Sequence, residues 1–94
     1  ESALKQMCKN SANQAEHAAK SRDMGVYLSE MLDSFNDPGW NKKENRIQKG
    51  EWVKATRLAY KHKTVSPETL HDMQYDMCIS QRAKYIRLFE QQGN

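Results

Sequence analysis

The chain has 94 residues, of which 37% are hydrophobic and 29% are charged, and its formal net charge is +3 at pH 7. A chain of this length is expected to form one domain, residues 1–94, whose hydrophobic core alone stabilises it only marginally. No apolar run approaches the roughly 20 residues that a membrane-spanning helix needs, so the sequence excludes a membrane span.

The first predicted helix runs from about Ala3 to Arg22. Small and apolar residues recur along it at spacings of three and four, at Leu4, Cys8, Ser11 or Ala12, Ala15, and Ala18 or Ala19. This spacing places them on one face, and small side chains allow a second helix to approach closely. Gly25 can adopt the left-handed backbone conformation that ends a helix, so we expect the helix to stop there.

A second, shorter helix is predicted from about Tyr27 to Phe35. Its apolar face consists of Leu28, Met31, Leu32 and Phe35. The residues Asn36–Gly39 then predict a turn, because Pro38 fixes φ and Gly39 accepts a positive φ. Trp40 follows directly, either as an exposed aromatic anchor or as a cover over the end of the helices.

A third helical segment is predicted to open at Asn41, since Glu44 three residues later makes a pattern close to a capping box. Its apolar side carries Ile47, Trp52, Ala55, Leu58 and Ala59, and Lys and Arg residues occupy another side. Gly50 lies in the middle of the segment, and the sequence leaves open whether it splits the segment into two helices.

The last predicted helix runs from Pro67 to about Gln91, after a linker over residues 61–65. Ser66 can cap its first turn, and Pro67 suits the first helical position because its missing N–H has no partner there. Leu70, Met73 and Met77 form the expected core stripe, which shifts near Ser80, where a kink is possible. No run of residues alternates as a strand would. The expected fold class is therefore an all-α bundle of four helices, with a fifth left open.

The two cysteines, Cys8 and Cys78, lie on the first and last predicted helices. They could be two inert buried thiols of a cytosolic protein, or one disulfide of an exported protein. The sequence favours the disulfide, because both cysteines lie on small or apolar helix faces and neither has another cysteine to pair with. Such a bridge would stabilise the fold by about 4 kcal/mol in the chain-entropy model.

The residue types that carry catalysis or bind metals do not occur in recognisable patterns. His17, His62 and His71 lack metal-ligand spacing, and neither cysteine has a second Cys or His two to four residues away. No phosphate-binding glycine loop and no nucleophile elbow is present. We therefore expect no catalytic residue, no metal site, no cofactor and no enzymatic activity.

Residues 42–63 are the most basic part of the chain, with eight Lys or Arg against two Glu. Their net charge is +6, so the rest of the chain carries -3. This asymmetry favours an anionic partner, and we expect Trp40, Arg46, Lys49 and Arg57 to contact an acidic surface of another protein. The alternative is a charged face that is merely solvated. No nucleic-acid-binding motif accompanies the basic residues, so nucleic-acid binding is not expected, and a homodimer stays open.

Several short segments together resemble a group of small exported helical proteins of Gram-negative bacteria. They are Cys8, Arg22–Val26, Leu28–Met31, Ala59–Tyr60, Val65–Glu68 and Cys78. The resemblance implies a periplasmic or secreted location and a Cys8–Cys78 bridge. It also implies that residues 36–50, which include Trp40, are an insertion specific to this protein.

The size, helices and single disulfide are also similar to those of type VI secretion immunity proteins and of acid-stress periplasmic chaperones. The sequence therefore indicates two alternative functions. The first is a periplasmic or secreted binding or inhibitor protein, for example an immunity protein that blocks a toxin. The alternative is a stress or chaperone-like protein, which would have to lose tertiary structure at acid pH.

Overall fold

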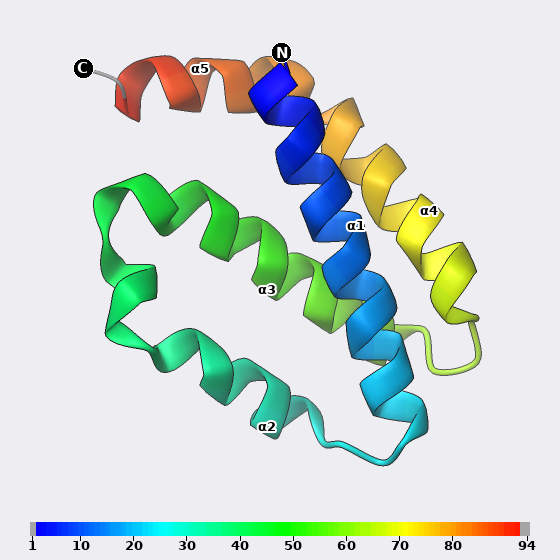
Figure 1. Ribbon diagram of the computed structural model, residues 1–94. Helices are drawn as coiled ribbons and strands as arrows, with labels where there is room; N and C mark the ends of the chain where they lie inside the picture. The colour runs from blue at the N-terminus through cyan, green and yellow to red at the C-terminus, as the bar shows by residue number, and fades with distance from the viewer. Residues whose placement is uncertain (1, 93–94) are drawn as a thin grey trace.

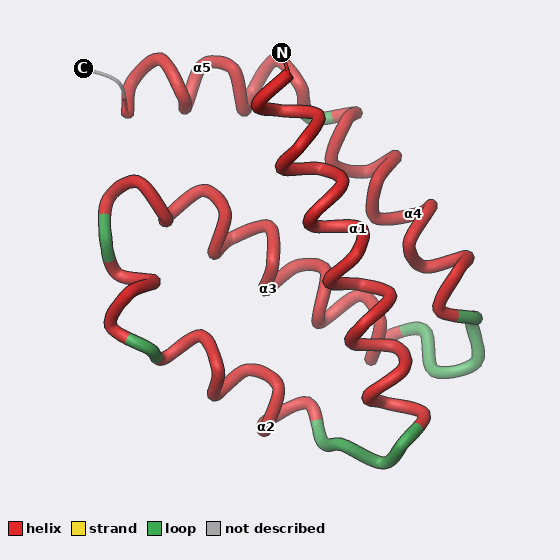
Figure 2. The backbone as a smooth tube through the Cα atoms, viewed as in Figure 1, coloured by secondary structure: helices red, strands yellow, loops and turns green. Residues whose placement is uncertain are grey.

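A computed structural model describes residues 2–92 and confirms the all-α fold (Figures 1 and 2). Five α-helices follow one another within this range: α1 (Ser2–Asp23), α2 (Leu28–Asp33), α3 (Arg46–Lys61), α4 (Pro67–Ser80) and α5 (Arg82–Gln92). Three short 3-10 helices lie between α2 and α3: η1 (Ser34–Asn36), η2 (Pro38–Asn41) and η3 (Lys43–Asn45). The described residues include no strand.

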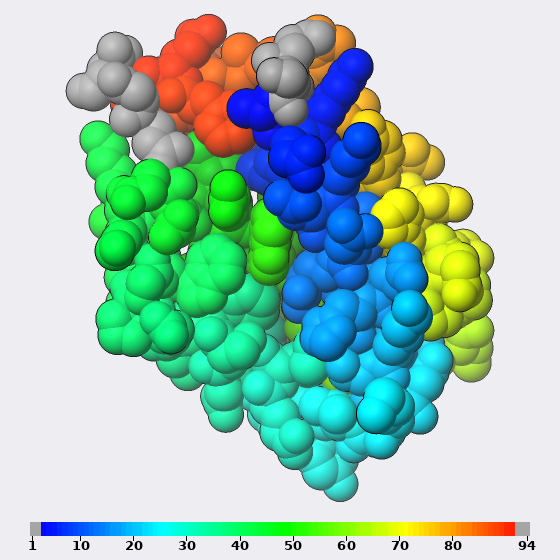
Figure 3. All heavy atoms as spheres, in the orientation of Figure 1, coloured from blue at the N-terminus to red at the C-terminus, as the bar shows by residue number. Residues whose placement is uncertain are grey.

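Helix α1 is the central element, and it packs against both α3 and α4 (Figure 1). The predicted small-residue seam is confirmed, because Leu4, Cys8, Ser11, Ala12, Ala15, Ala18 and Ala19 are all buried. Because alanine and serine side chains are small, the backbones of the packed helices approach closely along this seam. On the face shown in Figure 3, side chains fill the space that the ribbons leave between α2 and α3.

The predicted disulfide between Cys8 and Cys78 is present, and both residues are fully buried. Their Cα atoms lie 5.5 Å apart, a separation that a disulfide can span, so α1 and α4 approach closely at this point. The chain breaks at Gln81, so the predicted final helix is two helices, α4 and α5. Cys78 therefore lies on the fourth α-helix, and the bridge does not reach the last one.

The start of α4 is as the sequence predicts, but its buried face is not. The Ser66 hydroxyl accepts a hydrogen bond from the Thr69 backbone N–H at 3.2 Å, which is the expected cap. Leu70, Gln74 and Cys78 are the buried residues of α4, whereas Met77 is 43% exposed. The placement of Met77 in the core was wrong, because hydrogen bonds from the Gln74 amide hold a polar residue on the inward face instead.

Helix α3 is continuous through Gly50, so this glycine does not split the helix in two. The predicted capping box at Asn41 and Glu44 is wrong. Asn41 ends η2, and Glu44 lies within η3, so α3 begins only at Arg46. The residues that were expected to form the first turn of α3 form the 3-10 helices η2 and η3 instead.

Arg22 joins the end of α1 to the end of α3. Its guanidinium donates hydrogen bonds to the backbone carbonyls of Ala59, His62 and Val65 at 2.7, 2.8 and 2.9 Å. These carbonyls lie at and just beyond the last turn of α3, where a helix leaves its acceptors without partners. One half-buried cation therefore closes the helix end and holds the linker that follows it. Gly25, with φ of 89°, ends the turn after α1 as predicted.

Candidate functional site

The outward side of α3 carries a hollow of about 600 Å³, which we call the Trp40 hollow. It is lined by Trp40, Asn41, Arg46, Lys49, Gly50 and Val53. Trp40 and Asn41 belong to η2, and the other four residues lie on α3. An aromatic ring and an aliphatic side chain thus stand beside two cations on one surface.

Trp40 is placed by hydrogen bonds around its turn and by two aromatic neighbours. The Asp37 carboxylate accepts from the Gly39 backbone N–H at 2.8 Å, which fixes the start of η2. The indole packs against Phe35, with ring centroids 5.6 Å apart, and against Trp52 at 6.3 Å. Trp40 is half-buried, so it covers the Phe35 and Trp52 rings with part of its surface and lines the hollow with the rest.

The four residues predicted to bind a partner fall into two neighbouring places. Trp40, Arg46 and Lys49 line the Trp40 hollow together. Arg57 instead lines a second groove, over the C-terminal half of α3. The residues Arg46, Lys49 and Arg57 are three and eight residues apart along one helix, so the two hollows follow one another along it. Their role in partner binding stays a prediction.

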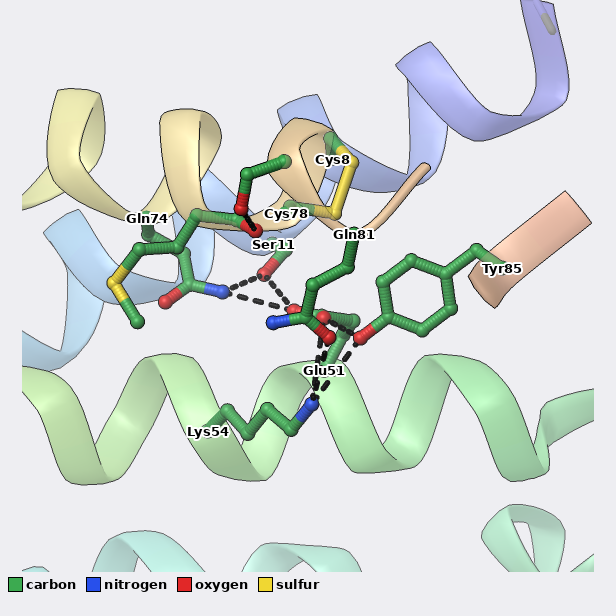
Figure 4. The surroundings of a disulfide bond; sticks show 10 residues. Cys8, Ser11, Glu51, Lys54, Gln74, Cys78, Gln81 and Tyr85 are labelled. Atoms are coloured by element: carbon green, nitrogen blue, oxygen red, sulfur yellow. Dashed lines mark hydrogen bonds and ion pairs between the residues drawn. A yellow bond between two sulfur atoms is a disulfide. The ribbon is translucent and has the colours of Figure 1, made fainter. Parts of the chain in front are cut away.

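A buried carboxylate, Glu51, lies on the side of α3 that faces Ser11 and Gln74 (Figure 4). Glu51 is only 1% exposed. One of its oxygens accepts hydrogen bonds from the Ser11 hydroxyl at 3.3 Å and from the Gln74 amide at 2.9 Å. The other accepts from the Tyr85 hydroxyl. The residues that donate hydrogen bonds to this carboxylate lie on α1, α4 and α5, so the carboxylate connects these three helices to α3.

The electrostatic state of Glu51 follows from its burial. Loss of solvent raises the pKa of the Glu51 carboxyl above its ordinary value of 4.5, and the Lys54 ammonium, 3.9 Å away, opposes that rise. Lys54 also donates to the Gln81 amide oxygen at 3.4 Å and to the Tyr85 hydroxyl at 3.3 Å. Both carboxylate oxygens accept hydrogen bonds within the protein, so the cluster holds α1, α4 and α5 to α3.

Sequence reasoning missed Glu51 and its partners Ser11, Gln74 and Tyr85 as a group. One signal was available: Glu51 lies four residues after Ile47 and four before Ala55, on the apolar stripe of α3. A charged residue at such a position must be paired or hydrogen-bonded when buried. Nothing in the sequence identifies its partners, because they lie on three other helices.

Within residues 2–92, no group of three His, Cys, Asp or Glu side chains is arranged to hold a metal ion. None of the helices described is both long and apolar enough to cross a membrane. His17 is exposed on α1, and His62 and His71 are half-buried on different elements.

Comparisons of the chain with protein-family models, with curated proteins and with solved structures find no match. The resemblance to small exported helical proteins thus stays a prediction.

Proposed function

We propose that this chain is an exported, non-catalytic protein that binds an acidic surface of another protein, as an immunity protein binds the toxin that it blocks. The observation that carries this proposal is the Trp40 hollow. There Arg46 and Lys49 stand beside the half-buried ring of Trp40 and the side chain of Val53. Tryptophan and arginine are the residue types that most often dominate the free energy of protein–protein binding.

The charge distribution supports an acidic partner. Residues 42–63 carry a net +6, whereas the rest of the chain is negative. A concentrated positive surface accelerates encounter with a negative one and disfavours partners of like charge. The aromatic wall would then supply the apolar contact that long-range attraction does not provide.

The disulfide supports export to the periplasm or out of the cell. Disulfides persist in oxidising compartments and are rare in the reducing cytosol. The Cys8–Cys78 bridge joins two helices at the centre of the fold, where both cysteines are fully buried. A protein stabilised in this way would gain that stabilisation only after leaving the cytosol.

The stress-chaperone alternative requires that the fold loosens as the pH falls. The buried Glu51 acts in the opposite direction, because its raised pKa makes the native state the better proton acceptor. This group therefore does not supply the acid-induced loosening that the chaperone alternative requires.

The proposal is tested by cross-linking in cells that make and export the protein. A photoreactive amino acid replaces Asn41, which is exposed on the Trp40 hollow, and in a second variant it replaces Lys5, which is exposed on α1. We expect a protein partner to be cross-linked from position 41 and not from position 5. Mass spectrometry then identifies the partner and the cross-linked segment, which should be acidic.

A charge-reversed variant, Arg46→Glu/Lys49→Glu, provides the second arm. It should abolish the cross-link from position 41, whereas the matched reversal Lys5→Glu/Lys9→Glu on α1 should leave it intact. Circular dichroism confirms that both variants are folded. Equal cross-linking from positions 41 and 5, or a cross-link that survives the reversal at Arg46 and Lys49, would refute the proposal.

A further inference from the structure

A second groove, of about 510 Å³, lies where α2, α3 and α4 meet. Leu28 of α2, Leu58 of α3 and Met77 of α4 provide its apolar walls. We call it the Met77 groove. It lies over the C-terminal half of α3, whereas the Trp40 hollow lies over the N-terminal half.

The apolar walls of this groove are open to solvent. Met77 is 43% exposed, although it is one of the larger apolar side chains of the molecule. Leu28 and Leu58 are only half-buried, and α2 contributes no fully buried residue. Tyr60 closes one end, where its hydroxyl donates to the Val26 carbonyl at 2.6 Å. One exposed and two half-buried apolar side chains, from three helices, thus converge on one groove.

Three cations line the same groove at helical spacing. Lys54, Arg57 and Lys61 lie on α3 three and four residues apart. Seven residues of α-helix span about 10 Å, so the cations form a row along the groove. Lys54 is engaged inward with Glu51, Gln81 and Tyr85.

Arg57 and Lys61 differ from Lys54. In the described part of the chain neither forms an ion pair. Both side chains are exposed and lie beside the apolar walls of the groove.

We infer that the Met77 groove binds an amphipathic helix of the partner protein, one with carboxylates at spacings of three or four residues beside its apolar stripe. This inference rests on the proposed function and adds the class of partner segment. Amphipathic helices place their apolar side chains in such grooves at helical spacing. A row of cations matches carboxylates repeated along a helix, whereas a fatty acid has a single carboxylate at one end.

The test uses a synthetic helical peptide of about five turns, with Leu at every third or fourth position and Glu beside each Leu. A control peptide carries Gln in place of every Glu. Binding is followed by the NMR signals of ¹³C-labelled Met methyl groups. The Met77 methyl should shift with the acidic peptide. The Met7 methyl, which is buried in the core, should not shift. The highly exposed Met24 methyl reports nonspecific association.

Charge reversal then locates the site. Arg57→Glu/Lys61→Glu should weaken binding of the acidic peptide by about tenfold or more, because two attractive contacts become repulsive. The matched reversal Lys5→Glu/Arg87→Glu, at exposed positions on α1 and α5, should change the affinity less than about twofold. The Gln peptide should bind the native protein more weakly than the Glu peptide does, because it lacks the charges that attract Arg57 and Lys61.

The outcomes separate this inference from the proposed function. Peptide binding that is lost in Arg46→Glu/Lys49→Glu and kept in Arg57→Glu/Lys61→Glu would overturn the Met77 groove and leave the proposed function standing. A Met77 shift with laurate and none with the acidic peptide would assign the groove to a lipid and also overturn the inference. If no protein is cross-linked from position 41 but the acidic peptide still binds the Met77 groove, the result would count against the proposed function alone.

Discussion

The two sides of α3 are built differently. On the inward side, buried alanines and a buried serine of α1 pack between α3 and α4, from Leu4 to Ala19, and the disulfide joins α1 to α4. On the outward side, α2 and the 3-10 turns lie against it through half-buried Leu and Trp side chains, and the Trp40 hollow and the Met77 groove lie there. Small side chains allow helices to close on one another, whereas long cationic and aromatic side chains hold them apart. The closed seam and the disulfide therefore belong to the inward side, and the proposed binding surfaces lie on the outward side.

Removal of the disulfide should have the largest effect on the inward side. Cys8→Ala/Cys78→Ala is expected to lower the free energy of unfolding by about 4 kcal/mol, since the bridge closes a long loop of the unfolded chain and both cysteines are buried. Denaturant unfolding of the variant and of the oxidised protein measures this difference. The oxidised protein should also be two protons lighter than the dithiol by mass spectrometry. An unchanged unfolding midpoint in the variant would contradict the assignment of stability to this side.

Arg22 should have the next largest effect, because one side chain supplies three hydrogen bonds. Arg22→Ala leaves the carbonyls of Ala59, His62 and Val65 without their donor, and we expect a loss of about 2–3 kcal/mol. Arg22→Lys should recover only part of it, because an ammonium cannot reproduce the planar fork.

The matched control for Arg22 is Lys20→Ala, which removes an exposed ion pair to Glu16 and should cost less than about 0.5 kcal/mol. The two losses are compared by thermal unfolding at the same pH. A similar effect of Arg22→Ala and Lys20→Ala would mean that the Arg22 contacts contribute no more than a surface ion pair.

Glu51 makes the stability of the inward side depend on pH. Burial raises its native pKa above the unfolded value near 4.5, so between these two values the native state holds a proton that the unfolded state has lost. Stability from this group is fully present below the unfolded pKa and is lost as the pH rises through the native pKa. Each unit of difference corresponds to about 1.4 kcal/mol.

The measurement compares wild type and Glu51→Gln by thermal unfolding between pH 7 and pH 4.5. Glu51→Gln should remove this pH dependence, so its stability relative to wild type is expected to be higher at pH 7 than at pH 4.5. The groups that face Glu51 are Ser11 of α1, Gln74 of α4, Tyr85 of α5, and the two nearby cations Lys54 and Lys84. A wild-type protein that loses tertiary structure by pH 4 would support the chaperone alternative instead.

The inward side was largely predictable from sequence, and the outward side was not. Helical spacing predicted the α1 seam and the helix faces that carry the two cysteines, and residue type predicted the Ser66 cap. Each of these depends only on local helix geometry. The Gln74 and Glu51 interactions were missed because their energy comes from hydrogen bonds between residues far apart in sequence. The hollows depend on how η1, η2 and η3 place α2 against α3, and no periodicity encodes that placement. Trp40, Arg46 and Lys49 were named from charge and residue type, and the structure adds only that they share one hollow.

The smallest expected effect concerns Gly50, which lies on α3 where the Trp40 hollow borders a neighbouring hollow over Glu51. A glycine inside a helix costs stability relative to alanine, and an added Cβ would meet no atom within 4 Å. Gly50→Ala should therefore raise the free energy of unfolding by about 0.5–1 kcal/mol. The matched variant Gly25→Ala should lower it by about 1 kcal/mol, because φ there is +89°, where an L side chain is strained. Denaturant unfolding of both variants gives the sign directly. If Gly50→Ala stabilises the fold but weakens cross-linking from position 41, then the open space beside α3 serves the partner at a cost to stability. A destabilising Gly50→Ala would show instead that the hollows are already closed by packing in solution.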